Sequence, residues 1–231
     1  MRISLLLLFT CLFIGAEAQK INSLLKMAKT YSAKGDVASA KQRLDSAIAL
    51  GFGNTKVLAE DPDFENLRKS KFYQSLADRA YANSHPCANL PAAHAFDFWL
   101  GEWDVYLTSN RAIKTGTSHI TSQSGGCVIL ESWESQGPHT GVSINYFDPT
   151  NGKWKQKWAG SSQDITEFYD GEYSEGIMTF KSDGLNPDGT TNVGKLTFTK
   201  MPTGEVRQHS QSSNDGGKTW TDVYDFIYVR R

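Results

Sequence analysis

Few side chains in this 231-residue sequence stand at spacings that support chemistry. Glu131 and Glu167 fall in segments of strand character, and they could act as a general acid and a general base only if both faced one cavity. Arg207 and His209 are two residues apart, so they share one face of a strand and could hold a carboxylate. These four side chains are the candidates for polar chemistry or polar recognition.

The histidines and cysteines do not have the spacing of a metal site. The sequence contains no His-x-x-x-His and no Cys-x-x-Cys, which gives a zinc site little support. A haem needs only one histidine, and His139 and His209 are the candidates; a surface or hydrogen-bonded role is the alternative for each. No nucleophile elbow, phosphate loop or dinucleotide fingerprint is present. We therefore expect no bound cofactor, and ligand binding is a simpler function than catalysis.

The elements that must position these side chains are short strands. From residue 103 onward, segments of strand character alternate with turns that contain Gly, Pro, Asn or Asp. We predict about ten strands, one roughly every ten residues, over 103–108, 113–121, 128–134, 140–147, 154–159, 165–170, 176–182, 195–200, 205–212 and 220–229. The fold class we expect is mainly β, an antiparallel barrel, because closing the sheet removes exposed strand edges.

Alternation along these strands indicates which side chains could face the inside of the barrel. With 39% hydrophobic and 12% aromatic residues, the chain has enough apolar surface for a core or for an aromatic cavity. We predict an apolar lining of Trp133, Tyr146, Trp154, Trp158, Phe168, Met178 and Phe180, with Gln156, Arg207 and His209 as polar contacts. The alternative is that the same faces fill a packed barrel.

The beginning of the chain has the parts of a secretory signal. A basic Arg2, an apolar run over 3–14 and a small-x-small cleavage site ending at Ala18 predict that residues 1–18 are removed. The apolar run is about twelve residues, too short to span a hydrocarbon core of roughly 30 Å, so we expect no transmembrane segment. The mature protein is therefore expected to be secreted or periplasmic.

Residues 19–84 have helical periodicity that is interrupted at Gly35, which predicts two antiparallel helices. The segment 85–95 contains Pro, Asn and Ser without periodicity and predicts a linker to a barrel at 96–231. Over about sixty residues the helical segment resembles one tetratricopeptide unit, although repeat arrays usually need about three copies. This resemblance implies a helical appendage, or a peptide-binding groove.

Removal of the signal leaves two cysteines, Cys87 and Cys127. An even pair in an oxidising compartment favours a disulfide, and closing a loop of about forty residues would stabilise the fold by roughly 3–4 kcal/mol in the chain-entropy model. Two buried free thiols are the alternative. The formal net charge of −1, without a cluster of Lys or Arg, gives no reason to expect nucleic acid or an anionic membrane as a partner.

The start of the first strand, Gly101-x-Trp103, together with Arg230 and Arg231 at the end of the last, resembles the calycin arrangement of lipocalins and fatty-acid-binding proteins. The resemblance implies that Trp103 closes one end of the barrel and that an arginine stacks on its indole. The stretches 96–105, 126–131 and 154–158 and the closing Asp-Gly-Gly-Lys-Thr-Trp resemble a family of exported bacterial domains of unknown function with a lipocalin-like barrel. That second resemblance covers about residues 87–231 and implies a fold but no reaction.

The segment Ser213 to Trp220 also resembles the Asp-box of sialidase propeller blades. A sialidase would need several copies, and we expect a hairpin in which Asp215 caps the turn.

The function that these patterns favour is the binding of a small, partly apolar or aromatic molecule inside the barrel. A hydrolase, isomerase or cyclase acting in the same cavity is the first alternative, and it would require ionisable residues that converge on the cavity with perturbed pKa values. The second alternative is a protein-interaction module that binds through the helical segment.

Overall fold

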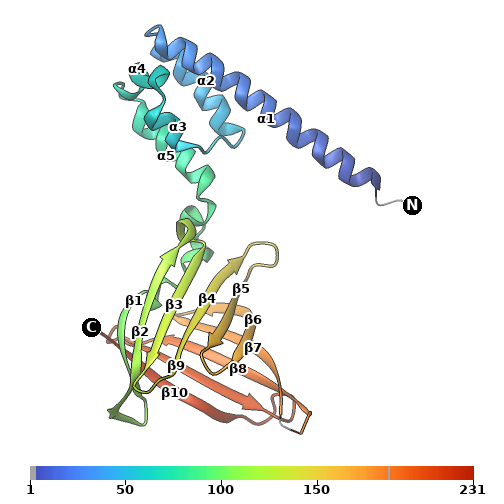
Figure 1. Ribbon diagram of the computed structural model, residues 1–231, viewed down its shortest axis with the longest axis vertical. Helices are drawn as coiled ribbons and strands as arrows, with labels where there is room; N and C mark the ends of the chain where they lie inside the picture. The colour runs from blue at the N-terminus through green and yellow to red at the C-terminus, as the bar shows by residue number, and fades with distance from the viewer. Residues whose placement is uncertain (1–3, 187) are drawn as a thin grey trace. The chain divides into compact units, whose positions relative to one another are not determined.

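The computed structural model describes residues 4–186 and 188–231, and side chains from Glu17 onward. The chain divides into two compact units, Met1–Pro86 and Cys87–Arg231, which are described separately. The first unit is helical and the second is a β-barrel (Figure 1).

The helical unit is built on the pair α1 and α2, joined by a tight turn. The helices are α1 (Ser4–Ala33), α2 (Val37–Ala49), α3 (Thr55–Glu60), α4 (Glu65–Arg68) and α5 (Tyr73–Ser84), with a 3₁₀ turn η1 (Pro62–Phe64) before α4. Gly35 has a φ of +80° at the turn, a conformation that glycine adopts without steric cost. The side chain of Asp36 then caps α2 by accepting a hydrogen bond from the Ser39 N–H at 3.1 Å. The interruption predicted at Gly35 is confirmed.

The core of this unit is mainly aliphatic and includes Ala28, Leu44, Leu58 and Leu76, together with the buried Phe64. Its relation to a tetratricopeptide unit stays a prediction.

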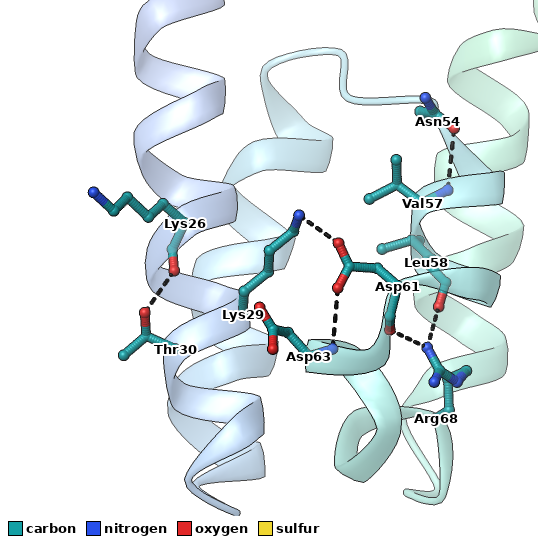
Figure 2. Close-up of polar contacts among 9 residues, drawn as sticks. All are labelled: Lys26, Lys29, Thr30, Asn54, Val57, Leu58, Asp61, Asp63 and Arg68. Carbon is teal, nitrogen blue, oxygen red and sulfur yellow. Dashed lines mark hydrogen bonds and ion pairs between the residues drawn. The ribbon is translucent and has the colours of Figure 1, made fainter.

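Asp61 connects three segments of the helical unit (Figure 2). Its carboxylate lies 2.5 Å from the Lys29 ammonium of α1, and this contact, as the largest cause, lowers the pKa of Asp61. The guanidinium of Arg68 donates to the backbone carbonyls of Leu58 and Asp61, at 3.2 and 2.6 Å. These bonds satisfy carbonyl groups at the end of α3 that the helix itself leaves without partners.

Helix α1 continues through the predicted cleavage site near Ala18. Arg2 and Ile3 of the predicted signal lie outside the described residues, and cleavage stays a prediction. Within residues 4–186 and 188–231, no helix combines the length and the apolar character that a membrane crossing requires.

The second unit is a closed, antiparallel, ten-stranded barrel, which confirms the predicted fold class. The strands are β1 (Gly101–Leu107), β2 (Asn110–Gln123), β3 (Val128–Ser135), β4 (Thr140–Asp148), β5 (Lys153–Gly160), β6 (Ile165–Ser174), β7 (Ile177–Leu185), β8 (Thr191–Lys200), β9 (Val206–Ser213) and β10 (Thr221–Arg230). Each strand pairs with its neighbours in sequence, and β1 pairs with β10 to close the barrel, with Trp103 opposite Arg230. The turns supply the required conformations, as at Gly152, where φ is +70°.

The segment before β1 closes one end of the barrel. It forms three 3₁₀ turns, η2 (Pro86–Asn89), η3 (Pro91–His94) and η4 (Asp97–Trp99). Phe96 and Trp99 are fully buried, and their rings are stacked with centroids 5.1 Å apart. Both belong to the core of the barrel together with Trp103. We call this half of the barrel the closed half.

A disulfide joins Cys87 to Cys127, with the two Cα atoms 5.0 Å apart. It connects the beginning of the closing segment to the turn between β2 and β3, where a short 3₁₀ turn, η5 (Ser124–Gly126), precedes Cys127. The predicted disulfide is confirmed.

Candidate functional site

A cavity of about 990 Å³ occupies the other half of the barrel, which we call the open half. Its lining comes from the ends of β3 and β5 and from the beginnings of β6 and β10, whereas Trp103 and Arg230 lie at the opposite ends of their strands. The volume falls in the range of small-molecule sites, about 300–1,000 Å³. The barrel is therefore packed in one half and hollow in the other.

Aromatic rings line one wall of the cavity. Tyr224 and Phe226, which alternate along β10, stack with centroids 4.9 Å apart. Phe226 also stacks on Trp133 of β3, at 6.1 Å and an interplanar angle of 15°. Three rings thus form a continuous apolar surface. The other aromatic residues of the lining are Trp158, Phe168, Tyr169 and Tyr228.

Two glycines make room for the tryptophans. A Cβ atom at Gly116 would lie 2.8 Å from the indole of Trp133, and a Cβ atom at Gly141 would lie 2.3 Å from the indole of Trp158. Each glycine is on the strand next to its tryptophan. Any residue other than glycine at positions 116 and 141 would fill the space that the two indoles occupy against the barrel wall. The glycines therefore leave the interior open.

The base of the cavity is polar and centres on Glu131. This carboxyl group is buried, 3% exposed, on the inward face of β3. Ser118 donates to its Oε1 at 2.8 Å and Ser143 donates to its Oε2 at 2.9 Å. The hydroxyl of Tyr228 lies 3.3 Å from Oε1 and donates to Oε1 of Gln208 at 2.7 Å.

The polar network extends along the neighbouring strands. Asn145 of β4 donates to the Ser143 hydroxyl at 3.0 Å and accepts from the Gln156 amide at 2.6 Å. Glu131, Gln156, Gln208 and Tyr228 also line the cavity. Because buried polar groups are costly without partners, this satisfied layer fixes the rotamers at the cavity base.

Burial shifts the acidity of this layer. Burial raises the pKa of Glu131, and the hydrogen bonds from Ser118 and Ser143 offset part of that shift. Burial also raises the pKa values of Tyr224 and Tyr228, and both are raised further by the nearby Glu131. A protonated Glu131 can donate a hydrogen bond to the oxygen of Tyr228, because the Tyr228 hydroxyl donates its own proton to Gln208.

A second polar cluster lies at the cavity mouth. Asp164 accepts a hydrogen bond from the Trp158 indole N–H at 2.7 Å, and this bond, as the largest cause, lowers the pKa of Asp164. His139 Nε2 lies 3.7 Å from the same carboxylate, and His139 Nδ1 lies 3.0 Å from the Ser162 hydroxyl. The mouth thus carries a carboxylate beside an aromatic ring.

The structure brings four of the predicted lining residues to the cavity: Trp133, Gln156, Trp158 and Phe168. Trp154, Met178 and Phe180 also face inward, but they are buried in the closed half and do not line the cavity. The reason is their position along the strands, because Phe96 of the closing segment packs against Trp154 and Phe180.

The structure corrects the prediction for Tyr146. On β4 the inward face includes Ser143 and Asn145, which are fully buried, and Phe147, which packs against the core of the closed half. Val142, Ile144 and Tyr146 lie on the outer surface, with Tyr146 38% exposed. The more apolar face of this strand faces outward because the inward face supplies hydrogen bonds to the Glu131 layer.

The structure also corrects Arg207 and His209, which lie on the outer face of β9. Arg207 forms a two-bond ion pair with Asp225 on β10, at 2.8 and 2.7 Å. His209 Nε2 lies 2.8 Å from Asp222, so it does not offer a haem ligand to the cavity. The inward residues of β9 include Gln208 and Ser210, which do line the cavity.

The predicted acid–base pair, Glu131 and Glu167, does not lie on one face of the barrel wall. Glu131 faces inward, whereas Glu167 points outward, 72% exposed, and pairs with Lys157 at 2.6 Å. The only cavity histidine among the described lining residues is His139 at the mouth. No cluster of three or more metal-ligating side chains occurs in the described part of the chain.

The closed end has the arrangement that the calycin resemblance implies. The guanidinium of Arg230 lies 4.5 Å from the ring centroid of Trp103 and donates to the Leu100 carbonyl at 3.1 Å. The Trp103 indole donates to the Trp99 carbonyl at 2.9 Å. Arg231 instead pairs with Asp104 at 2.9 Å. Trp103 and Arg230 are therefore structural and distant from the cavity.

The Asp-box segment forms a hairpin turn. The Asp215 carboxylate accepts from the backbone N–H groups of Lys218 and Thr219, both at 2.9 Å, and from the Thr219 hydroxyl at 2.6 Å. Asp215 therefore caps the turn, as expected from the sequence.

The part of the lining that β9 and β10 supply was not predicted from the sequence. Tyr224, Phe226 and Tyr228 stand at alternating positions of a predicted strand, and this aromatic alternation is the signal that could have identified them. Gln208 and Ser210 carry no comparable signal, because alternation alone does not say which face of β9 is inward.

No protein-family model matches the chain, and no curated protein matches it significantly.

Proposed function

We propose that the protein binds a small, partly apolar molecule in the open half of the barrel. The observation that carries this proposal is the cavity of about 990 Å³ between a stacked aromatic wall and a polar base. Packed barrels fill such a volume with side chains, whereas here Gly116 and Gly141 hold two indoles against the wall. A ligand would place its apolar part against the rings and a polar group near Glu131, Gln208 and Tyr228.

The proposal includes the compartment and the family. A signal over residues 1–18 would direct the chain to the periplasm or outside the cell, and the Cys87–Cys127 disulfide supports an oxidising compartment. The closed ten-stranded barrel with Trp103 under Arg230 supports membership of the lipocalin-like group of barrels.

Titration with N-phenyl-1-naphthylamine, an uncharged fluorescent probe, tests the binding proposal. We expect probe fluorescence to rise and tryptophan emission to fall with a saturable dependence, because Trp133 and Trp158 line the cavity. The Phe226→Ala variant, which removes the middle ring of the wall, should bind the probe at least fivefold more weakly. The matched control, Tyr146→Ala, removes an aromatic ring from the outer surface and should bind like the wild type. Absence of saturable binding, or equal effects of both variants, contradicts the proposal.

A second candidate function is acid-assisted catalysis in the same cavity. The observation that favours it is the convergence of the buried Glu131 and Tyr228 with the partly buried Tyr224, whose pKa values are all raised. In that case a protonated Glu131 would donate a proton to the substrate. Tyr228 would lie between Glu131 and the substrate and orient the substrate. The test compares Glu131→Gln with the wild type on a compound that the wild type converts. Normal probe binding without conversion by Glu131→Gln would support catalysis. Conversion by both proteins would exclude this role.

A further inference from the structure

The charged side chains of the barrel are distributed unequally between its two faces. Among the described residues that line the cavity, none is Lys or Arg. The nearest strands do contain basic residues, but these lie on the outer face. Lys157 pairs with Glu167 at 2.6 Å, Arg207 pairs with Asp225 at 2.7 Å, and Lys195 lies over the Trp220 ring at 4.5 Å.

Four acidic residues are among the described residues that line the cavity: Glu131, Asp164, Glu167 and Asp183. Glu167 is 72% exposed and pairs with Lys157, whereas Glu131 and Asp164 lie at the two ends of the cavity. Glu131 is at the base and receives hydrogen bonds from Ser118 and Ser143. Asp164 is at the mouth and is hydrogen-bonded by Trp158. Neither offers an anionic ligand a positive charge. A protonated Glu131 leaves the base with only the dipoles of neutral groups, and an ionised Glu131 adds a negative charge there. His139 at the mouth already lies near the Asp164 carboxylate.

The apolar wall offers no counter-charge either. The rings of Trp133, Phe226 and Tyr224 stack on one another along one side of the cavity, and an aromatic ring carries no net charge. A carboxylate bound inside this barrel would therefore lose its hydration without gaining a counter-charge.

We infer that the ligand is an uncharged or cationic amphiphile, such as an amine, an alcohol or a neutral aromatic compound, and that the cavity rejects carboxylates and sulfonates. This inference rests on the proposed binding function and specifies its ligand class. A polar head that is neutral can bond to the amide of Gln208 and the hydroxyl groups at the base, and a cationic head can approach Asp164 at the mouth.

The test uses two probes with one apolar skeleton. N-phenyl-1-naphthylamine is uncharged, and 8-anilinonaphthalene-1-sulfonate adds a sulfonate to the same skeleton. At neutral pH we expect the uncharged probe to bind the full-length protein at least tenfold more tightly. In competition, decanol and decylammonium should displace the uncharged probe at concentrations at least tenfold lower than decanoate. Equal affinity for both probes, or displacement by decanoate at the concentration of decanol, overturns the inference while the binding function stands. If neither probe binds, the proposed function itself has failed.

A gain-of-function variant tests the cause. Thr166 lies opposite Trp158 on the inward face of β6, near the mouth, where a lysine side chain can extend toward solvent. Thr166→Lys should increase the affinity for the sulfonate probe at least fivefold. Val142→Lys adds the same charge to the outer face of β4 and should leave that affinity unchanged. If both variants increase it equally, the preference comes from the net charge of the protein, and the assignment to the lining is wrong.

Discussion

The closed and open halves of the barrel are built from the same ten strands but have opposite interiors. In the closed half, inward rings from several strands pack on Phe96 and Trp99, which come from the segment before β1. In the open half, the inward positions carry serines, glutamines and glycines as well as aromatics, and a cavity of about 990 Å³ remains. The strands set the diameter of the barrel in both halves. What differs is whether an additional segment fills the lumen.

The closed half is expected to contribute mainly to the stability of the barrel, and the open half mainly to ligand recognition. The closed half contains fully buried rings, whose removal leaves a cavity in a packed core. The open half holds rings that are already partly exposed to the lumen, so their removal changes the shape of a site more than the free energy of folding. All six tryptophans of the chain lie in the barrel unit, at positions 99, 103, 133, 154, 158 and 220. Tryptophan emission therefore follows the unfolding of the barrel and does not report on the helical unit.

The largest effect is expected from removal of a phenylalanine from each half. Phe96→Ala should lower the free energy of unfolding by about 3–5 kcal/mol, because Phe96 is fully buried among aromatic rings. Phe226→Ala, in the open half, should cost about 1–2 kcal/mol, since its ring is only partly buried. Urea denaturation followed by tryptophan emission measures both. Equal destabilisation would mean that the open half is as tightly packed as the closed half.

A smaller effect is expected from filling the space beneath one indole. Gly141→Ala places a methyl group 2.3 Å from the present position of the Trp158 ring, so the ring must move into the lumen. We expect a loss of stability of about 1–3 kcal/mol and weaker binding of N-phenyl-1-naphthylamine. Gly137→Ala, whose added Cβ atom would have an ordinary contact of 3.7 Å, is the control and should change stability by less than about 0.5 kcal/mol. Unchanged probe affinity in Gly141→Ala would show that Trp158 does not define the cavity.

The smallest effect is expected from Glu131→Gln and is detected as a difference between two pH values. Burial raises the pKa of Glu131 in the folded protein, so the folded state holds this proton at pH values where the unfolded chain has released it. The wild type should therefore lose stability relative to Glu131→Gln as the pH rises above about 4.3, the ordinary value for Glu, until the raised pKa is passed. Urea denaturation of both proteins at pH 4 and pH 7.5 measures this change. A difference that does not depend on pH would mean that folding does not raise the pKa of Glu131.

Much of the architecture could be predicted from the sequence because it depends on local rules. Strand alternation and turn residues predicted the ten-stranded antiparallel barrel, and the count of cysteines favoured the Cys87–Cys127 disulfide. The position of Trp103 beneath Arg230 was implied by resemblance, and the structure has this contact.

The lining of the site was less predictable, because alternation assigns residues to two faces without saying which face is inward. On β5 the inward face is the more aromatic one, and Gln156 and Trp158 were identified. On β4 the inward face is the more polar one, because Ser143 and Asn145 complete the hydrogen bonds of the buried Glu131 layer. The prediction that Tyr146 lines the cavity was therefore wrong.

By itself, therefore, the sequence determined the strands, their turns and the partners that close the barrel. The tertiary structure alone decided which faces of β4 and β9 point inward and how far the closing segment fills the lumen. The physical reason is that a polar residue is stable inside a barrel only when neighbouring strands supply its hydrogen bonds, and those neighbours are brought together only by the closed sheet. Glu131 is the clearest case: its partners Ser118 and Ser143 come from the strands on either side.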